Sequence, residues 1–487
     1  MIYIVVFCVG ALGMILELTG VRLMAPYFGT SFVVWTNIIG VFLGALSLGY
    51  IIGGKLGDKN QNLGGISFLM TVAGVYILVF GVFLNYIFSL IANGFSDLRV
   101  SSFIASLFIF AFPGFVFGML VPFVIRVSLK SIKNAGVISG RLYALSTFGS
   151  IFGTFFAGFF LIPSFGTGLV FNLIGVFSIG IAVLLTLISK KKVYFMLLIF
   201  ILSGVFAQNS KIKFLLEDVV YETDSLYSRL AVIRRFHKET GRPVLVLKNS
   251  RGAQSSMFLD IDNDLSAEYS KYFRLSNFFK PDIKKALMIG GGAYSYPKEF
   301  LRDNKEAFLD VVEIDPVITQ IAKSHFKLED DERLRIYHQD ARLFMNANKN
   351  LYDAVFVDAY GSDFTIPFSL STREYAGHIK KSLSEDGVVV TNVISSLSGE
   401  GSTILEAVYS TYKSVFPHVL VFAVSDNPPG EIQNVILVSF KSEGTPIAED
   451  PGGVYGQYLS RRIIYEVDPG LVLTDDFAPV EYLTRMF

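Results

Sequence analysis

Long apolar runs fill the N-terminal part of the chain, from Met1 to about Asn209, with few charged residues between them. A helix that crosses a membrane needs about 20 predominantly apolar residues. The candidate spans are Ile2–Met24, Phe32–Gly54, Gly65–Ala92, Ser101–Leu129, Ile138–Ile162, Gly168–Ser189 and Val193–Ala207. The last run, of roughly fifteen residues, is the shortest. We therefore predict an α-helical transmembrane bundle of about seven spans in residues 1–208.

The pattern changes after about Lys211, where charged residues reach the density of an ordinary globular protein. Short alternating segments at Val219–Arg234 and Pro243–Lys248 predict strands, and Leu265–Phe279 predicts a helix. Further strands are predicted at Ala286–Ile289, Leu309–Ile314, Leu334–His338, Ala354–Val357 and Gly387–Asn392. Strands that alternate with helices are typical of a parallel sheet with crossover helices. We expect a small β-rich part in residues 209–280 and a Rossmann-like α/β domain in residues 281–487.

Composition supports the membrane assignment and excludes some partners. Hydrophobic residues make up 52% of the chain and charged residues 17%, below the roughly 25% of soluble domains. The mean hydropathy is +0.50, so we expect a multi-pass protein of the cell membrane, in contact with the lipid bilayer. The formal net charge of zero argues against nucleic acid as a partner. The five histidines are scattered without metal-ligand spacing, and we expect no metal site.

The distribution of lysines leaves the side of the C-terminal domain open. Lysines follow the second, fourth and sixth spans at Lys55, Lys59, Lys130, Lys133 and Lys190–Lys192. The positive-inside rule places these loops and the N-terminus in the cytoplasm. With seven spans the C-terminal domain would be external, whereas use of a cytosolic nucleotide favours the cytoplasm. Small residues at helix-packing spacing, such as Gly149 and Gly153, are compatible with a homodimer.

A glycine turn and three acidic residues follow successive predicted strands. Gly290, Gly291 and Gly292 follow the first strand, where they would let the backbone approach a ligand closely. Glu313 ends the second strand about 20 residues later, the position at which an acidic side chain binds ribose hydroxyls. Asp340 and Asp358 follow the third and fourth strands. Since ligands bind at the carboxyl ends of parallel strands, these residues predict a nucleoside-binding site.

Four motifs carry a family resemblance. They are Leu287-Met288-Ile289-Gly290-Gly291-Gly292, Val312-Glu313-Ile314-Asp315, Gln339-Asp340-Ala341 and Tyr352-Asp353-Ala354-Val355-Phe356-Val357-Asp358. Together they resemble the spermidine synthase (polyamine aminopropyltransferase) superfamily, within the class I S-adenosylmethionine-binding fold. With the apolar spans included, the whole layout resembles the membrane-fused spermidine synthase-like proteins.

The resemblance implies roles for particular residues. Gly290–Gly292, Glu313, Asp340 and Ala341 would bind the nucleoside of S-adenosylmethionine or its decarboxylated form, which serves as a substrate. Asp358 matches the catalytic aspartate, which would take a proton from the attacking amine. The acceptor would be a small-molecule amine or a polyamine. Positions suggested for acceptor binding are Tyr227, Gln254, Tyr294, Tyr360 and Asp363.

Departures from the family pattern leave the reaction open. Ala293-Tyr294-Ser295 stands where the polyamine enzymes have Asp-Gly-Gly, and Asp358-Ala359-Tyr360-Gly361-Ser362-Asp363 stands where they have Asp-Ser-Ser-Asp-Pro. Tyr294 and Tyr360 form either an aromatic wall for a cation or ordinary packing. The leading hypothesis is a membrane-anchored aminopropyltransferase-like enzyme. The alternatives are a methyltransferase, a sulfonium-cleaving lyase, and a transporter of polyamines or other small molecules with a nucleotide-sensing domain.

Overall fold

The structure is a computed structural model that describes residues 2–29, 31–59, 62–95, 97–129, 134–188, 218–249, 252–260, 265–361, 365–444, 446, 450, 453–464 and 470–484. The chain forms two compact units. The first contains Met1–Glu217 together with Thr223–Arg229. The second contains Asp218–Glu222 and Leu230–Met486.

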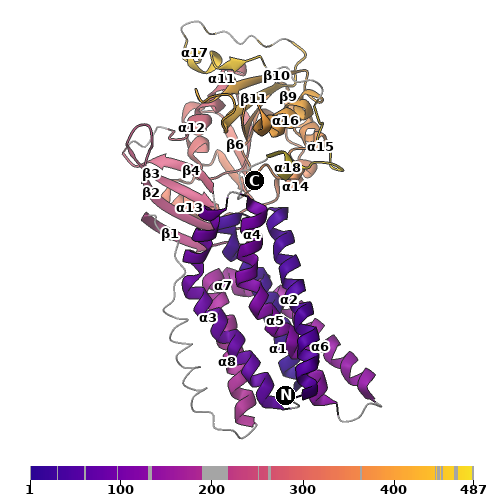
Figure 1. Ribbon diagram of the computed structural model, residues 1–487. Helices are drawn as coiled ribbons and strands as arrows, with labels where there is room; N and C mark the ends of the chain where they lie inside the picture. Colours follow the sequence, from indigo (N-terminus) through magenta and orange to yellow (C-terminus); the bar gives the residue numbers. More distant parts are fainter. Residues whose placement is uncertain are drawn as a thin grey trace. The chain divides into compact units, whose positions relative to one another are not determined.

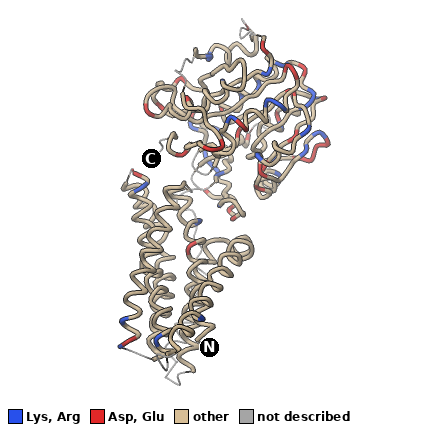
Figure 2. Tube along the Cα trace, turned by 90° about the vertical axis from the view of Figure 1, so that its right-hand side faces the viewer, with Lys and Arg blue, Asp and Glu red and all other residues tan. Residues whose placement is uncertain are grey.

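The first unit is a bundle of long apolar helices (Figure 1). It contains α1 (Ile2–Phe28), α2 (Phe32–Lys59), α3 (Leu63–Gly94), α4 (Leu98–Ser106), α5 (Phe112–Ser128), α6 (Ala135–Phe156), α7 (Ile162–Phe165) and α8 (Thr167–Ile188). Short π-helical segments, Leu107–Ala111 and Ala157–Leu161, join α4 to α5 and α6 to α7. Figure 2 shows few charged residues along these helices.

Six helices in the described residues are long and apolar enough to cross a membrane, which suggests a membrane protein. They are Ile2–Phe28, Phe32–Lys59, Leu63–Gly94, Leu98–Ser128, Ala135–Phe165 and Thr167–Ile188, and each contains most of one of the first six predicted spans. The seventh predicted span, Val193–Ala207, lies outside the described residues.

Small residues let neighbouring helices of the bundle approach closely. A Cβ atom added to Gly149 of α6 would lie 2.0 Å from the carbonyl oxygen of Phe7 in α1. A Cβ atom added to Gly10 of α1 would lie 2.1 Å from the carbonyl oxygen of Ser146. The backbones of α1 and α6 are therefore in direct contact, which larger side chains would prevent.

The second unit begins with a four-stranded sheet of order β1-β2-β3-β4. Its strands are β1 (Asp218–Asp224), β2 (Arg229–Phe236), β3 (Pro243–Asn249) and β4 (Gly252–Phe258). The pairs β2–β3 and β3–β4 are antiparallel, as expected for strands joined by short turns. Apart from the end of β1 and the first residue of β2, the sheet belongs to the same unit as the α/β part, and its status as a separate small domain stays a prediction.

The α/β part contains an eight-stranded sheet of order β12-β10-β11-β9-β8-β5-β6-β7. Its strands are β5 (Lys285–Ile289), β6 (Phe308–Val312), β7 (Leu334–Tyr337), β8 (Tyr352–Val357), β9 (Leu383–Ser395), β10 (His418–Ala423), β11 (Gln433–Phe440) and β12 (Arg462–Ile463). The strands β5 to β9 pair in parallel, which matches the predicted alternation.

The remaining pairs, β9–β11, β10–β11 and β10–β12, are antiparallel. The prediction of a parallel sheet is therefore wrong for the last strands of the chain, and the sheet contains both parallel and antiparallel pairs. The cause is the connection between β10 and β11, residues 424–432, which contains no helix. A crossover between parallel strands needs a dozen or more residues, usually with a helix, whereas a short turn reverses the chain.

Both faces of the parallel strands are buried, because helices cover them. These helices include α12 (Ser295–Asp303), α13 (Pro316–His325), α14 (Ala341–Ala347), α15 (Arg373–Lys381) and α16 (Thr403–Lys413). Along β5, Leu287 and Ile289 pack in one hydrophobic cluster, and Ala286 and Met288 pack in another. Strands of this kind present only their carboxyl ends to a ligand, so the loops after β5, β6, β7 and β8 are the place for a site.

Candidate functional site

The glycine turn after β5 is held against the loop after β8. Gly290 has φ +91°, its N–H donates to the carbonyl oxygen of Val312 at 2.9 Å, and the N–H of Asp358 donates to the carbonyl oxygen of Ile289 at 2.9 Å. A Cβ atom at position 290 would lie 2.3 Å from the carbonyl oxygen of Asp358. Both the left-handed backbone and this close approach require glycine. The structure therefore brings together Gly290 and Asp358, two residues that the sequence predicted to belong to the site.

Glu313 lies directly after β6 and bonds to the same glycine turn. Its side chain, 6% exposed, accepts hydrogen bonds from the N–H groups of Gly291 (2.9 Å) and Gly292 (3.4 Å) at Oε2. The other oxygen, Oε1, accepts from the N–H of Asp315 at 3.0 Å. Burial raises the pKa of Glu313, and the hydrogen bonds from Asp315 and Gly291 act in the opposite direction. The geometry thus puts a carboxylate beside a glycine turn, a pairing suited to the hydroxyl groups of a ribose.

Asp358 lies at the carboxyl end of β8 and has a donor on each oxygen. The hydroxyl of Tyr269, in α10 (Glu268–Lys271), donates to Oδ2 at 2.9 Å. The amide Nδ2 of Asn392 in β9 donates to Oδ1 at 3.0 Å. Burial raises the pKa of Asp358, while the hydrogen bonds from Asn392 and Tyr269 lower it. The pKa of Tyr269 is raised well above its ordinary value by burial and by the charge of Asp358, so the phenol stays protonated as a donor.

Asp340 follows β7 and begins the next helix. Its Oδ1 accepts from the N–H of Leu343 at 3.0 Å, which makes it the N-cap of α14. Ala341, the first residue of α14, is buried. The cap fixes the Asp340 carboxylate at the same strand edge as Glu313 and Asp358, because the strands before all three residues are parallel.

The structure describes four of the five acceptor positions predicted from the sequence. Tyr294 is 0% exposed, and its hydroxyl shares a hydrogen bond of 2.7 Å with Thr319 Oγ1. Its burial fits the packing alternative, because a side chain in the core cannot form the wall of an open site. Tyr360 is half-buried; its hydroxyl donates to the carbonyl oxygen of Asn392 at 2.6 Å and accepts from the N–H of Ile394 at 3.1 Å.

The other three acceptor positions are Gln254, Tyr227 and Asp363. Gln254 is a half-buried residue of β4. Tyr227 belongs to the segment Thr223–Arg229 of the first unit. Asp363 lies outside the described residues.

Tyr269 and Asn392 were not predicted as site residues. Asn392 ends the predicted strand Gly387–Asn392, and a polar residue after buried Val388, Val389 and Val390 was an available signal. Tyr269 lies in a predicted helix with several other aromatic residues, and nothing in its spacing distinguishes it from them.

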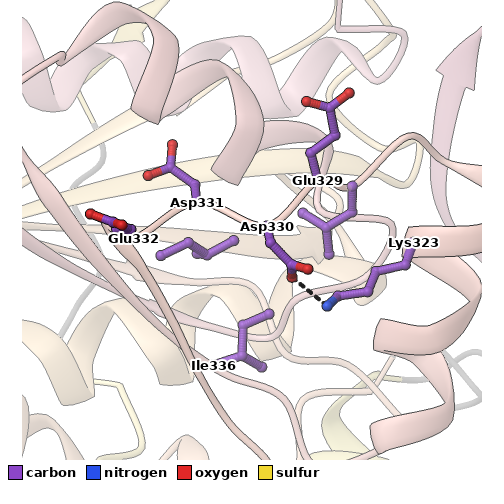
Figure 3. A pocket seen from close by; sticks show the side chains of 8 residues that line it. Lys323, Glu329, Asp330, Asp331, Glu332 and Ile336 are labelled. Atoms are coloured by element: carbon purple, nitrogen blue, oxygen red, sulfur yellow. Dashed lines mark hydrogen bonds and ion pairs between the residues drawn. The ribbon is translucent and has the colours of Figure 1, made fainter.

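A separate pocket of about 260 Å³ lies at the opposite edge of the sheet. Its lining includes Lys323, the acidic segment Glu329–Glu332 and Ile336, and Figure 3 shows the ion pair between Lys323 and Asp330. The segment precedes β7, so this pocket is at the amino ends of the strands, away from Glu313 and Asp358. Among the described residues, no group of three or more His, Cys, Asp or Glu side chains is arranged to hold a metal ion.

Comparison with known proteins bears on the second unit. The family model described as "Spermine/spermidine synthase domain" matches residues 270–434. A polyamine aminopropyltransferase of Vibrio vulnificus is 26% identical over 280 residues, which cover 54% of this chain and 91% of that protein. A polyamine aminopropyltransferase of Alkaliphilus oremlandii is 28% identical over 216 residues, covering 38% of this chain and 74% of that protein.

Among solved structures, a spermidine synthase from Thermotoga maritima is similar over 46% of this chain and 72% of its own, with 21% identity and a TM-score of 0.35. The segment matched by the family model holds Glu313, Asp340 and Asp358. Residues 270–434 of the chain therefore match a spermine/spermidine synthase domain, and the chain is similar in sequence to polyamine aminopropyltransferases.

Proposed function

We propose that the second unit transfers an aminopropyl group from decarboxylated S-adenosylmethionine, or a related group from S-adenosylmethionine, to an amine. The observation that carries this proposal is the doubly hydrogen-bonded Asp358 carboxylate, held against the glycine turn that also contacts Glu313. The homologues named polyamine aminopropyltransferase support the same reaction.

The transfer needs a base and a well-positioned donor. The amine nitrogen forms a bond to the carbon beside the sulfonium, and the carbon–sulfur bond breaks. Its electron pair remains on sulfur, which gives the thioether methylthioadenosine. The nitrogen must lose one proton, and the Asp358 carboxylate accepts it before releasing it to water. Because the sulfonium is already a good leaving group, orientation supplies most of the remaining rate enhancement.

The donor's nucleoside would be held by the strand-end carboxylates. Glu313 would accept hydrogen bonds from the ribose hydroxyls, since each carboxylate oxygen can accept more than one donor. Asp340 would accept from the adenine amino group, and its N-cap bond to Leu343 keeps the side chain in place. Gly290–Gly292 would let the backbone pass close to the ligand.

Product analysis tests the reaction. The full-length protein in detergent is incubated with each sulfonium donor and a panel of monoamines, diamines and polyamines. Methylthioadenosine formed only when an amine is present supports aminopropyl transfer. Methylthioadenosine formed without an amine indicates cleavage, and S-adenosylhomocysteine indicates methyl transfer. Nucleoside binding without turnover, with uptake of polyamines into vesicles, would favour the transporter with a sensing domain.

Two matched variants assign the base. Asp358→Asn keeps the shape of the side chain but removes its basicity, and we expect a loss of turnover of at least about 100-fold. Asp330→Asn, at the opposite edge of the sheet, is the control and should retain wild-type turnover. Turnover of Asp358→Asn at the wild-type rate would show that another group takes the proton.

A further inference from the structure

A chain of amide hydrogen bonds leads from β11 through β9 to Asp358. Asn434 Nδ2 donates to Asn392 Oδ1 at 3.0 Å, and Asn392 Nδ2 donates to Asp358 Oδ1 at 3.0 Å. Asn392 is 3% exposed, so protein groups rather than bulk water satisfy its side chain.

The chain defines which end of the Asn392 amide faces the carboxylate. An asparagine side chain has one acceptor oxygen and one donor nitrogen. If the amide were flipped, its oxygen would face the carboxylate of Asp358, and its NH₂ group would face the NH₂ group of Asn434. Both contacts would be repulsive, so only the orientation with Nδ2 toward Asp358 satisfies the three side chains.

The backbone around Asn392 is also fixed. The hydroxyl of Tyr360 donates to the carbonyl oxygen of Asn392 at 2.6 Å and accepts from the N–H of Ile394 at 3.1 Å. In the antiparallel pairing of β9 with β11, Asn392 lies opposite Ile436 and Ile394 lies opposite Asn434. Asn392 therefore cannot move away from Asp358 without breaking both the Tyr360 contacts and the ladder.

We propose that Asn392 is a positioning residue for the transfer reaction: oriented by Asn434 and held by Tyr360, it fixes the Asp358 carboxylate and favours its ionised form. This inference rests on the proposed function, since it assigns a role in proton transfer. The physical basis is that a hydrogen bond to a carboxylate stabilises the charged form, whereas burial disfavours it. A base must be ionised to accept a proton, so the bond extends its activity toward lower pH.

The groups that face Asp358 keep this titration simple. Within the described residues they are Tyr269 from α10, Asn392 from β9 and Tyr360 from the loop after β8. Burial raises the pKa values of Tyr269 and Tyr360 well above the ordinary tyrosine value. Both phenols stay protonated across the neutral range, and the amide does not titrate. Glu313, the other carboxylate with a raised pKa, accepts its hydrogen bonds from backbone N–H groups and not from Asn392. A shift of the acidic limb caused by a change at Asn392 therefore reports on Asp358.

The test is the pH dependence of kcat/KM of the full-length protein in detergent, with decarboxylated S-adenosylmethionine and the best amine found. We expect Asn392→Ala to move the acidic limb up by about one pH unit, the effect of losing one hydrogen bond to a charged group. Asn392→Asp should move it further, because a second carboxylate would face Asp358. Asn434→Ala should cause a smaller shift in the same direction, and Asn346→Ala, on the exposed surface of α14, should cause none.

The outcomes separate this role from the proposed function. A wild-type acidic limb in Asn392→Ala, with or without a lower kcat, would reduce Asn392 to a structural residue and overturn the inference. If Asn392→Ala does not fold, Asn434→Ala decides the matter by the same criterion. A wild-type protein that forms no methylthioadenosine with any amine would overturn the proposed function itself, and this role with it.

Discussion

Replacing Gly290 by alanine tests whether the site is assembled by direct backbone contact. The residue has φ +91°, a conformation that L side chains rarely adopt. The new Cβ atom would lie 2.3 Å from the carbonyl oxygen of Asp358 and 3.3 Å from Cα of Ala359. These neighbours are backbone atoms, so no side chain can rotate to relieve the overlap. The loops after β5 and β8 would have to separate.

The expected destabilisation follows from these contacts. A left-handed backbone costs a residue with a Cβ atom roughly 1–2 kcal/mol. Forcing extra atoms into a packed region typically costs about 1–3 kcal/mol. Separation of the loops also weakens the Gly290 to Val312 and Asp358 to Ile289 hydrogen bonds, each worth about 1 kcal/mol. A loss of about 3–5 kcal/mol in the free energy of unfolding corresponds to a melting temperature lower by about 10 °C.

Calorimetry of the full-length protein in detergent measures the stability, and titration with methylthioadenosine measures nucleoside binding. We expect Gly290→Ala to melt at a lower temperature and to bind methylthioadenosine at least about tenfold more weakly, since 1.4 kcal/mol already corresponds to tenfold. Gly377→Ala is the matched control, because this glycine of α15 has nothing within 4 Å of an added Cβ atom. A variant at position 290 that melts and binds as the wild type does would refute the close approach of the two loops.

Two further substitutions and the pH profile of the wild type have defined outcomes. Glu313→Gln removes the charge beside the glycine turn, and the Kd of methylthioadenosine in a binding titration should rise about 10-fold to 100-fold; an unchanged Kd would remove Glu313 from the nucleoside site. Tyr352→Phe removes the 2.8 Å hydrogen bond to Asp310, which is 0% exposed, and should cost about 1–3 kcal/mol in the melting experiment without changing the KM of the donor. In the wild type, burial raises the pKa of Asp358, so kcat/KM should fall on the acid side with a midpoint above 3.8, the ordinary aspartate value; a midpoint at or below that value would contradict the assignment.

The parts of the fold that depend on local pattern could be predicted from the sequence. Apolar runs long enough to cross a membrane become helices, because backbone polar groups must be satisfied within each segment. The strands β5, β6 and β8 follow short apolar runs that are followed by glycine or acidic residues, and parallel strands bring those ends together at one edge. This reasoning led from the residues after β5, β6 and β8 to Gly290, Glu313 and Asp358.

Features that depend on distant pairing could not be predicted. Strands β10 and β11 are apolar in the same way as β8, and their direction follows from the connection between them. Tyr269 and Asn392 reach Asp358 from positions 89 and 34 residues away in the sequence, and only Asn392, a polar residue after buried valines, has a local pattern to mark it. Tyr294 follows the glycine turn as a site residue would. Its backbone has a positive φ of 56°, and its buried hydroxyl shares a hydrogen bond with Thr319, two features that the sequence does not reveal.

Burial of the two site carboxylates, Glu313 and Asp358, disfavours their ionised forms in the folded protein. Their folded-state pKa values are raised, so a proton binds Glu313 and Asp358 more tightly in the folded than in the unfolded protein. The contribution of these two groups to stability is therefore most favourable below the pKa of the unfolded state. It declines as the pH rises through the folded-state pKa, and above that pKa the ionised carboxylates destabilise the folded protein by the full amount.

A cationic ligand would offset that penalty. Decarboxylated S-adenosylmethionine carries a positive sulfonium that methylthioadenosine lacks, and an opposite charge within a few ångströms favours the ionised carboxylate. At neutral pH the cationic donor should raise the melting temperature more than the neutral nucleoside does, and the difference should shrink below the folded pKa values, where the carboxylates are protonated. Equal stabilisation by the two ligands at every pH would mean that the buried charges do not face the sulfonium. Asp358 would then have no part in electrostatic recognition of the donor.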